Sequence, residues 1–271
     1  MFPLQLLGFD VDVVNSVHFS NHTGYAHGFR GDVLAGNQLK EILEGLEVNG
    51  LLGNIEHLLT GYIGSESFLM GVLDVLTTLR KHNPKVRFVC DPVLGDHGKF
   101  YVPTELVALY KEKVIPVADV VTPNQFEVEQ LTGIRADSVN EARKACKVLH
   151  DMGPSLVIIT SIVLEGDADV MAVLASRRKD NGDEEVWRID TPIIPGSFTG
   201  TGDLCAALFL GHTALEDDLA LALEKVIGTM QAVIMRTHQG VDGSVASKEL
   251  KLIASKLDIE NPPSHLKAYQ I

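Results

Sequence analysis

Regular alternation of strand-like and helix-like segments is the feature that most restricts the fold of this chain. Five apolar runs, rich in β-branched residues, predict strands over residues 9–17, 57–63, 86–93, 118–123 and 156–163. Helical patterns lie between them, near residues 37–48, 65–82, 104–115, 124–132 and 138–152. Nearly continuous apolar runs are typical of strands covered on both faces. The alternation therefore predicts an α/β fold with a largely parallel sheet between helices.

The pattern changes between residues 169 and 192. Two strand-like stretches flank a polar turn that contains Asn181-Gly182, which is a strong hairpin signal and predicts an antiparallel hairpin near the sheet edge. Three further helices are expected near residues 201–214, 217–238 and 247–259, and a short one at residues 2–8. With 271 residues and no repeat, low-complexity tract or linker, we expect one domain spanning residues 1–271.

Charge and cysteine content narrow the classes of function. A formal net charge of −13 argues against nucleic acid and anionic membranes as partners. The chain has no apolar run long enough for a transmembrane helix, and its start has no secretory signal pattern. Its three widely spaced cysteines suggest reduced thiols, so we expect a cytoplasmic protein. An anionic ligand would have to be held by backbone N–H groups, a few basic residues or a metal ion.

The stretch "SFTGTGDLCAALFLG" (197–211) places glycines, threonines and one carboxylate at the start of an apolar helix. A helix N-terminus offers unpaired N–H groups to an anion, and glycines let a phosphate approach the backbone. Asp203 would then serve as a general base for a nearby hydroxyl. The alternative is structural: Thr201 caps the helix, and Asp203 only pairs with its dipole. The spacing matches neither a P-loop nor a dinucleotide-binding fingerprint.

Polar residues also follow the predicted strands. Asp91 and Asp96 follow the strand predicted at residues 86–93. Their carboxylates either bind a metal ion, or belong to an Asp-Pro turn with a solvated carboxylate. Asn124 begins a helix as its N-cap, with Glu127 either functional or merely exposed. The threonine and serine hydroxyls of "ITS" (159–161) end the next predicted strand, where they either contact a phosphate or have no ligand. Because ligands bind at the carboxyl edge of parallel sheets, these signals together favour a phosphate-handling cleft.

A loop with three histidines follows the first predicted strand. His18, His22 and His27 lack the helix pattern and glutamate of a zinc-protease motif. We therefore favour a loop that covers or contacts a ligand over a metal site.

Several blocks occur in order between residue 2 and about residue 240: "FPLQLLGFDVDVVNSVHFSNHTGYAH", "LTGYIG", "CDPVLGD", "YVPTELV", "TPNQFEVEQLTG", "VIITS" and "FTGTGDL". Together these blocks resemble the pyridoxal kinases, a family of the ribokinase-like superfamily. The resemblance implies a Rossmann-like αβα sandwich. It also implies ATP-dependent phosphorylation of the 5′-hydroxymethyl group of pyridoxal, pyridoxine and pyridoxamine.

The resemblance also implies roles for individual residues. Asp203 looks like the catalytic base, and Gly200, Thr201 and Gly202 look like the anion hole for the transferring phosphoryl group. The other positions it assigns are Asp91 and Asp96 (phosphate and cation), Thr122 and Thr160 (monovalent cation), Asn124, Glu127 and Ser161 (nucleotide and metal-bound water), and Thr23 and Tyr101 (pyridine ring). Residues 18–30 would lie over the substrate. The implied cofactors are MgATP, with zinc as an alternative metal, and K⁺ or Na⁺; a homodimer is the usual state.

One departure from the family is visible at the N-terminus. Pyridoxal kinases normally begin with a strand that ends in a serine at the pyridine, followed by a Gly-Tyr-Val-Gly-Asn stretch. This sequence begins partway through the following helix, which leads us to expect reduced vitamer affinity and stability. Two other interpretations remain open. One is a weakly active or inactive relative that binds nucleotide or vitamer, or pairs with a full-length subunit. The other is a kinase of a different hydroxymethyl compound, such as a pyrimidine.

Overall fold

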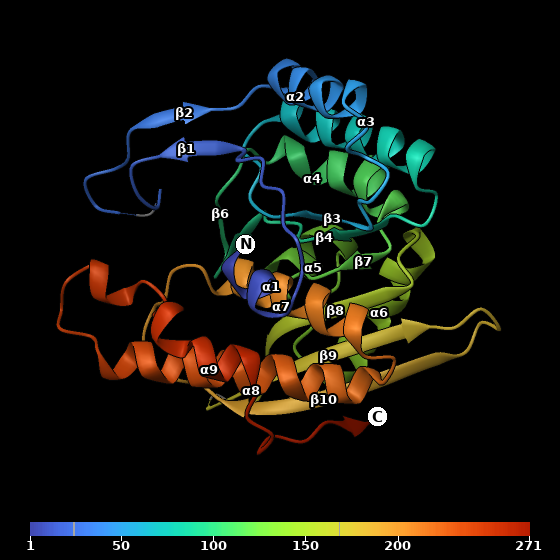
Figure 1. Ribbon diagram of the computed structural model, residues 1–271. Helices are drawn as coiled ribbons and strands as arrows, with labels where there is room; N and C mark the ends of the chain where they lie inside the picture. The colour runs from blue at the N-terminus through green and yellow to red at the C-terminus, as the bar shows by residue number, and fades with distance from the viewer. Residues whose placement is uncertain (24, 168) are drawn as a thin grey trace.

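Seven strands form the central sheet of the protein, in the order β11-β10-β9-β8-β7-β4-β3 (Figure 1). The computed structural model describes residues 1–23, 25–167 and 169–271. The strands are β3 (His57–Thr60), β4 (Arg87–Cys90), β7 (Val120–Val121), β8 (Leu156–Val163), β9 (Val170–Arg178), β10 (Glu184–Pro192) and β11 (Tyr269–Gln270). Strands β3, β4, β7 and β8 are parallel, whereas β9, β10 and β11 add antiparallel pairs.

Helices cover both faces of this sheet (Figure 1). One face carries α2 (Gly36–Val48), α3 (Glu66–His82), α4 (Glu105–Leu109), α5 (Gln125–Thr132) and α6 (Val139–Met152); the other carries α1 (Phe2–Leu6), α7 (Thr201–Leu215), α8 (Leu219–Gln239) and α9 (Lys256–Glu260). Because side chains alternate along a strand, Phe88 and Ile159 enter the first hydrophobic core while Val89 and Ile158 enter the second. The expected three-layered αβα sandwich is confirmed.

Local signals determine the start of α6 and the turn between β9 and β10. Ser138 caps α6 by accepting a hydrogen bond from the Glu141 N–H at 3.3 Å, and the helix ends at Gly153. Gly182 adopts a φ of 87° in the turn between β9 and β10, where the predicted hairpin lies beside the short strand β11.

After α4 the chain continues through a π-helical turn (Tyr110–Val114) and a 3₁₀ turn (Ile115–Val117). No helix of the described residues is both long and apolar enough to cross a bilayer.

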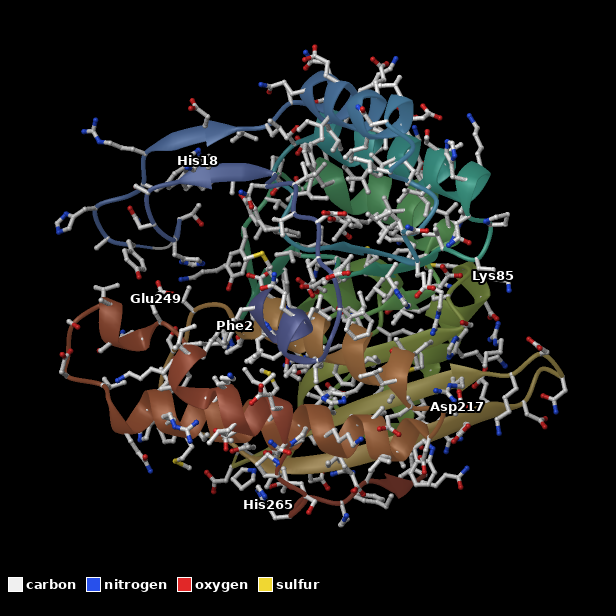
Figure 2. The ribbon with its side chains drawn as sticks, in the orientation of Figure 1. Phe2, His18, Lys85, Asp217, Glu249 and His265 are labelled. Carbon is white, nitrogen blue, oxygen red and sulfur yellow. The ribbon has the colours of Figure 1, made fainter. Side chains whose placement is uncertain are left out.

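The strand predicted over residues 9–17 is wrong. Residues 9–16 form no strand, and only β1 (Val17–Phe19) pairs, antiparallel with β2 (Gly31–Val33). β3 is the outermost strand on that side of the sheet, so residues 9–16 run without a ladder partner. We call residues 17–23 and 25–33 the flap; Figure 2 shows it projecting from the body, with His18 labelled. Gly31 allows the two strands of the flap to pair closely, because a Cβ there would lie 1.9 Å from the His18 carbonyl oxygen.

The helix predicted over residues 247–259 is also largely wrong. This region contains two 3₁₀ turns, η3 (Ala246–Lys248) and η4 (Ile253–Ser255), followed by the short α9. Between the two turns Glu249 makes a parallel bridge with Thr199, and Leu250 and Leu252 pack against the second core. These tertiary contacts override the local helical pattern.

Candidate active site

The carboxyl ends of three parallel strands meet at one edge of the sheet. Asp91 directly follows β4, and its N–H donates to the Thr60 carbonyl at 3.0 Å. Thr122 directly follows β7, and its N–H donates to the Cys90 carbonyl at 3.1 Å. The Thr122 hydroxyl then donates to Asp91 Oδ1 at 3.2 Å. Asp91 is only 5% exposed, so this edge contains a buried carboxylate held by a neighbouring strand end.

Helix α7 begins at the same edge with an uncapped N-terminus. Its N-cap is Gly200, whose φ of 89° is left-handed, and within the described part of the chain no side chain caps the helix. Thr201 is therefore the first helical residue, and the alternative that it caps the helix is wrong. Glycine at position 200 permits this backbone and leaves the first-turn N–H groups available to an anion.

Asp203 projects from the first turn of α7 close to Asp91. A Cβ on Gly61 would lie 3.0 Å from Asp203 Oδ1, and a Cβ on Gly202 would lie 3.7 Å from Asp91 Oδ2. Burial raises the pKa of Asp203, and the Met1 α-amino group and His22 offset part of this rise. The Asp203 side chain nevertheless remains accessible to solvent. Asp203 is thus an accessible carboxylate with a raised proton affinity, as a general base requires.

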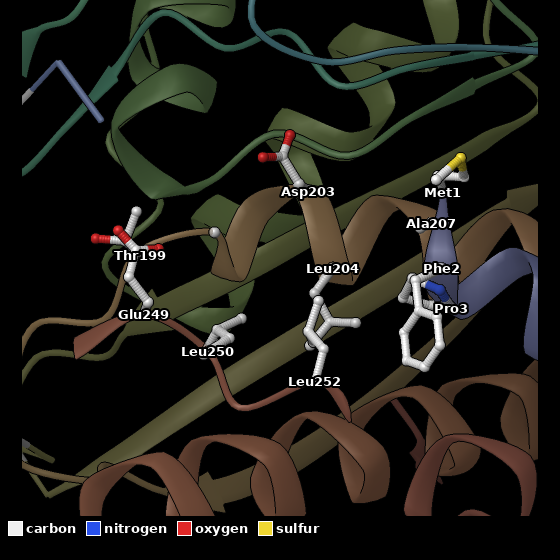
Figure 3. A pocket seen from close by; sticks show the side chains of 11 residues that line it. Met1, Phe2, Pro3, Thr199, Asp203, Leu204, Ala207, Glu249, Leu250 and Leu252 are labelled. Carbon is white, nitrogen blue, oxygen red and sulfur yellow. The ribbon is translucent and has the colours of Figure 1, made fainter. Parts of the chain in front are cut away.

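Asp203 lines a cavity of about 230 Å³. The other walls come from Thr199 and Gly200, from the segment that carries Glu249, and from α1 (Figure 3). In Figure 3 Asp203 points away from Leu250 and Leu252, which form an apolar side of the cavity. Neither Thr23 nor Tyr101 is among the described residues that line this cavity.

Asn124 and Glu127 form a reciprocal cap at the start of α5. The Asn124 side chain accepts from the Glu127 N–H at 2.9 Å, and the Asn124 N–H donates to Glu127 Oε2 at 2.8 Å. Glu127 Oε1 accepts from the Leu94 N–H at 3.0 Å, and Asn124 Nδ2 donates to the Gly95 carbonyl at 2.8 Å. Asn124 is confirmed as the N-cap, but Glu127 is 3% exposed, so the alternative of a merely exposed Glu127 is wrong.

Burial and a neighbouring carboxylate raise the pKa of both Asp91 and Glu127. Burial, followed by the charge of Asp203, raises the pKa of Asp91 to about 7. Burial and the charge of Asp91 raise the pKa of Glu127 to about 8, although backbone N–H donors oppose the rise. The Tyr110 hydroxyl lies buried without a hydrogen-bond partner among the described residues; burial, followed by the charges of Cys90, Asp91 and Glu127, raises its pKa. Such a pair fits a hard divalent cation, which would favour both ionised forms.

Within the described residues no cluster of three or more His, Cys, Asp or Glu is arranged to hold a metal alone. His18, His22 and His27 are all exposed on the flap.

A β-bulge brings the hydroxyls of β8 to this edge. Thr160 and Ser161 together oppose a single residue of β9, and the Thr160 N–H donates to the Pro123 carbonyl at 3.0 Å. Bulges re-aim side chains at sheet ends. Thr160 and Ser161 therefore lie next to the turn that follows Thr122.

Asp96 lies in the hairpin formed by β5 (Gly95–Asp96) and β6 (Lys99–Phe100), and Tyr101 directly follows β6. Asp96 Oδ1 accepts from the His97 N–H at 2.7 Å. Tyr101 is 55% exposed; burial and then the charges of Asp96 and Glu127 raise its pKa, which places it on the Glu127 side of the site. Thr23 lies near the tip of the flap.

Sequence reasoning missed three contributors to the site. Gly61 makes room for Asp203, and its position directly after β3 was a usable signal. Leu94 acts through its backbone N–H, and Glu249 lines the cavity from a distant segment. No sequence pattern marks either of the last two.

Comparisons with known proteins show the family of this chain. Residues 16–245 match the model of a family described as phosphomethylpyrimidine kinase. The pyridoxal kinase of Arabidopsis thaliana is 50% identical, over 99% of this chain and 87% of that protein. The human pyridoxal kinase is 44% identical, over 96% of this chain and 89% of that protein. The solved structure of Leishmania donovani pyridoxal kinase with ADP and pyridoxamine has a TM-score of 0.93 and 32% identity, covering 100% of this chain and 92% of that one. These matches confirm the expected ribokinase-like fold, and the chain belongs to the pyridoxal kinase family.

Proposed function

We propose that this protein transfers the γ-phosphoryl group of ATP to the 5′-hydroxymethyl group of pyridoxal, pyridoxine or pyridoxamine. Relatives at up to 50% identity are pyridoxal kinases, and Leishmania structures contain ADP with pyridoxamine or pyridoxine. The observation that carries the proposal is the placement of Asp203, an accessible carboxylate in the first turn of an uncapped helix, beside Asp91.

Asp203 takes the proton of the vitamer hydroxyl as its oxygen bonds to the γ-phosphorus. The bond from that phosphorus to the β–γ bridging oxygen breaks, and ADP leaves. The first-turn N–H groups at Gly200, Thr201 and Gly202 stabilise the charge on the equatorial phosphoryl oxygens. The raised pKa of Asp203 brings its proton affinity nearer to neutral pH, where general bases are most effective.

Asp91 and Glu127 would hold magnesium or zinc, which neutralises the charge of the β- and γ-phosphates when bound. Asp96, Thr122 and Thr160 would hold K⁺ or Na⁺; the hydrogen bond from Thr160 to Pro123 keeps the two hydroxyl-bearing strand ends together. Asn124 and Ser161 contact the nucleotide.

Thr23 and Tyr101 contact the pyridine ring. Both lie outside the lining of the Asp203 cavity, so we assign them to the vitamer side from the resemblance alone. Residues 1–271 form one domain that performs the reaction. We further propose that the protein is a homodimer and acts in the cytoplasm.

The test is turnover of purified protein with MgATP and separate vitamers, followed by the appearance of the 5′-phosphate ester. We expect phosphorylation of at least one of the three vitamers. The panel includes 4-amino-5-hydroxymethyl-2-methylpyrimidine, because the matched family is described as phosphomethylpyrimidine kinase. Phosphorylation of the pyrimidine alone would assign the protein to that reaction. Nucleotide binding without any turnover would contradict the proposal and favour a non-catalytic relative.

A further inference from the structure

The flap is a unit that is held together by its own hydrogen bonds. Asn21 Nδ2 donates to the Gly28 carbonyl at 2.9 Å, and the Arg30 N–H donates to the Ser20 hydroxyl at 3.1 Å. The rings of Phe19 and Phe29 pack with their centroids 4.3 Å apart. These contacts lie between its two arms, so the flap can move relative to the body without losing them.

One contact joins the tip of the flap to the opposite side of the site. The Tyr25 hydroxyl donates to Glu249 Oε1, which belongs to a segment 224 residues further along the chain. Figure 2 shows the loop between β1 and β2 extending toward the segment that carries Glu249. This hydrogen bond raises the pKa of Tyr25, which keeps the phenol protonated and able to donate. We call this contact the latch.

Glu249 is in turn attached to the loop that precedes α7. It makes a parallel bridge with Thr199, and the Thr199 N–H donates to the Lys248 carbonyl at 3.1 Å. Thr199 is followed directly by Gly200, the N-cap of α7. Glu249, Thr199, Gly200 and Asp203 all line one cavity. A movement of Glu249 therefore moves the residues that set the first-turn amides of α7.

The flap also acts on Asp203 itself. The charge of His22 lowers the pKa of Asp203, so the flap lies close enough to influence the base. Tyr25 holds His22 in place, because the Tyr25 N–H donates to the His22 carbonyl at 3.3 Å and the two rings lie 6.2 Å apart. Loss of the contact between Tyr25 and Glu249 would thus detach the flap tip, which carries His22, from the Glu249 segment.

We propose that Tyr25 and Glu249 are positioning residues that tie closure of the flap to the placement of the α7 N-terminus. Neither residue touches the reacting atoms. With the latch formed, the flap covers the site only when the phosphate-binding amides are in place, so water is excluded during transfer. With the latch broken, the vitamer binds less tightly and water competes with it for the phosphoryl group. This inference rests on the proposed function.

The kinetic test compares Tyr25→Phe with Tyr269→Phe. Tyr269 is a matched control, because its hydroxyl also donates to a surface carboxylate, Asp190 Oδ2 at 2.7 Å, on the strands β10 and β11. For Tyr25→Phe we expect a roughly tenfold rise in KM for pyridoxal, kcat within about threefold, and a higher rate of ATP hydrolysis without vitamer. Tyr269→Phe should match the wild type in all three.

Glu249→Gln keeps an acceptor oxygen and should give an intermediate rise in KM. The double variant Tyr25→Phe/Glu249→Gln should be no worse than Tyr25→Phe alone, because both remove one interaction. Additive effects, or identical kinetics for Tyr25→Phe and Tyr269→Phe, would overturn the latch.

A readout without turnover separates failure of the latch from failure of the proposed function. Hydrogen exchange of the ligand-free protein should show faster exchange in Tyr25→Phe than in wild type, both in the flap and in residues 200–204. Faster exchange confined to the flap would refute the coupling even in an active enzyme. An inactive wild type that nevertheless shows both changes would refute the proposed function and leave the latch supported.

Discussion

Replacing Asp91 with Asn should stabilise the ligand-free protein in a pH-dependent way. In the unfolded chain Asp91 ionises around its ordinary pKa of 3.8, whereas in the folded protein it keeps its proton up to about pH 7. Between these pH values the unfolded state binds fewer protons, so the raised pKa lowers the free energy of unfolding as pH rises. The loss is complete above about pH 7. A pKa difference between 3.8 and about 7 corresponds to about 4 kcal/mol.

Asp91→Asn removes this cost and keeps an oxygen that accepts from Thr122. Its free energy of unfolding should therefore exceed that of the wild type by about 4 kcal/mol at pH 8 and by a clearly smaller amount at pH 5. Urea unfolding followed by circular dichroism at both pH values measures the difference. Asp74→Asn, at an exposed position of α3, is the matched control and should change stability by less than about 0.5 kcal/mol. A gain below about 1 kcal/mol at pH 8, or an equal gain at pH 5, would refute this account of the buried carboxylate.

Three further predictions address the site and the fold. Binding of MgATP near pH 7.5 should release protons, because a cation favours the ionised form of Glu127, whose pKa is about 8; calorimetry in two buffers of different ionisation enthalpy measures this, and a release that is undiminished in Glu127→Gln would contradict the assignment. Gly61→Ala places a Cβ 3.0 Å from Asp203 Oδ1 and should lower kcat about tenfold without lowering the melting temperature; full activity would show that Asp203 has room to move. Gly228→Ala places a Cβ 2.1 Å from the Pro263 carbonyl oxygen and should lower the free energy of unfolding by about 1–3 kcal/mol; an unchanged urea midpoint would contradict the packing of α8 against the C-terminal segment.

Local sequence signals predicted the elements whose formation depends on their own residues. The cap at Ser138 and the turn at Gly182 are decided within a few positions, and the structure has both as expected. The strand expected over residues 9–17 failed because a strand also needs a partner, and no alternation of apolar residues supplies one. The helix expected over residues 247–259 failed because Glu249 pairs with Thr199 instead.

The same division holds at the site. Asp91, Asn124 and Asp203 could be placed at one edge, because they follow strand ends or begin helices there. The burial of Glu127 could not be predicted, since it depends on the N–H of Leu94 in another loop. The contact between Tyr25 and Glu249 joins residues 224 positions apart, and only the folded chain reveals it.

The most direct test of the central claim is the turnover number of Asp203→Asn with pyridoxal and MgATP, measured beside the dissociation constant for ATP. Asparagine fills the same space but cannot accept the proton of the vitamer hydroxyl. We predict that kcat falls by at least about 10²-fold while the affinity for ATP changes little. A variant that keeps nearly full kcat would show that Asp203 is not the base.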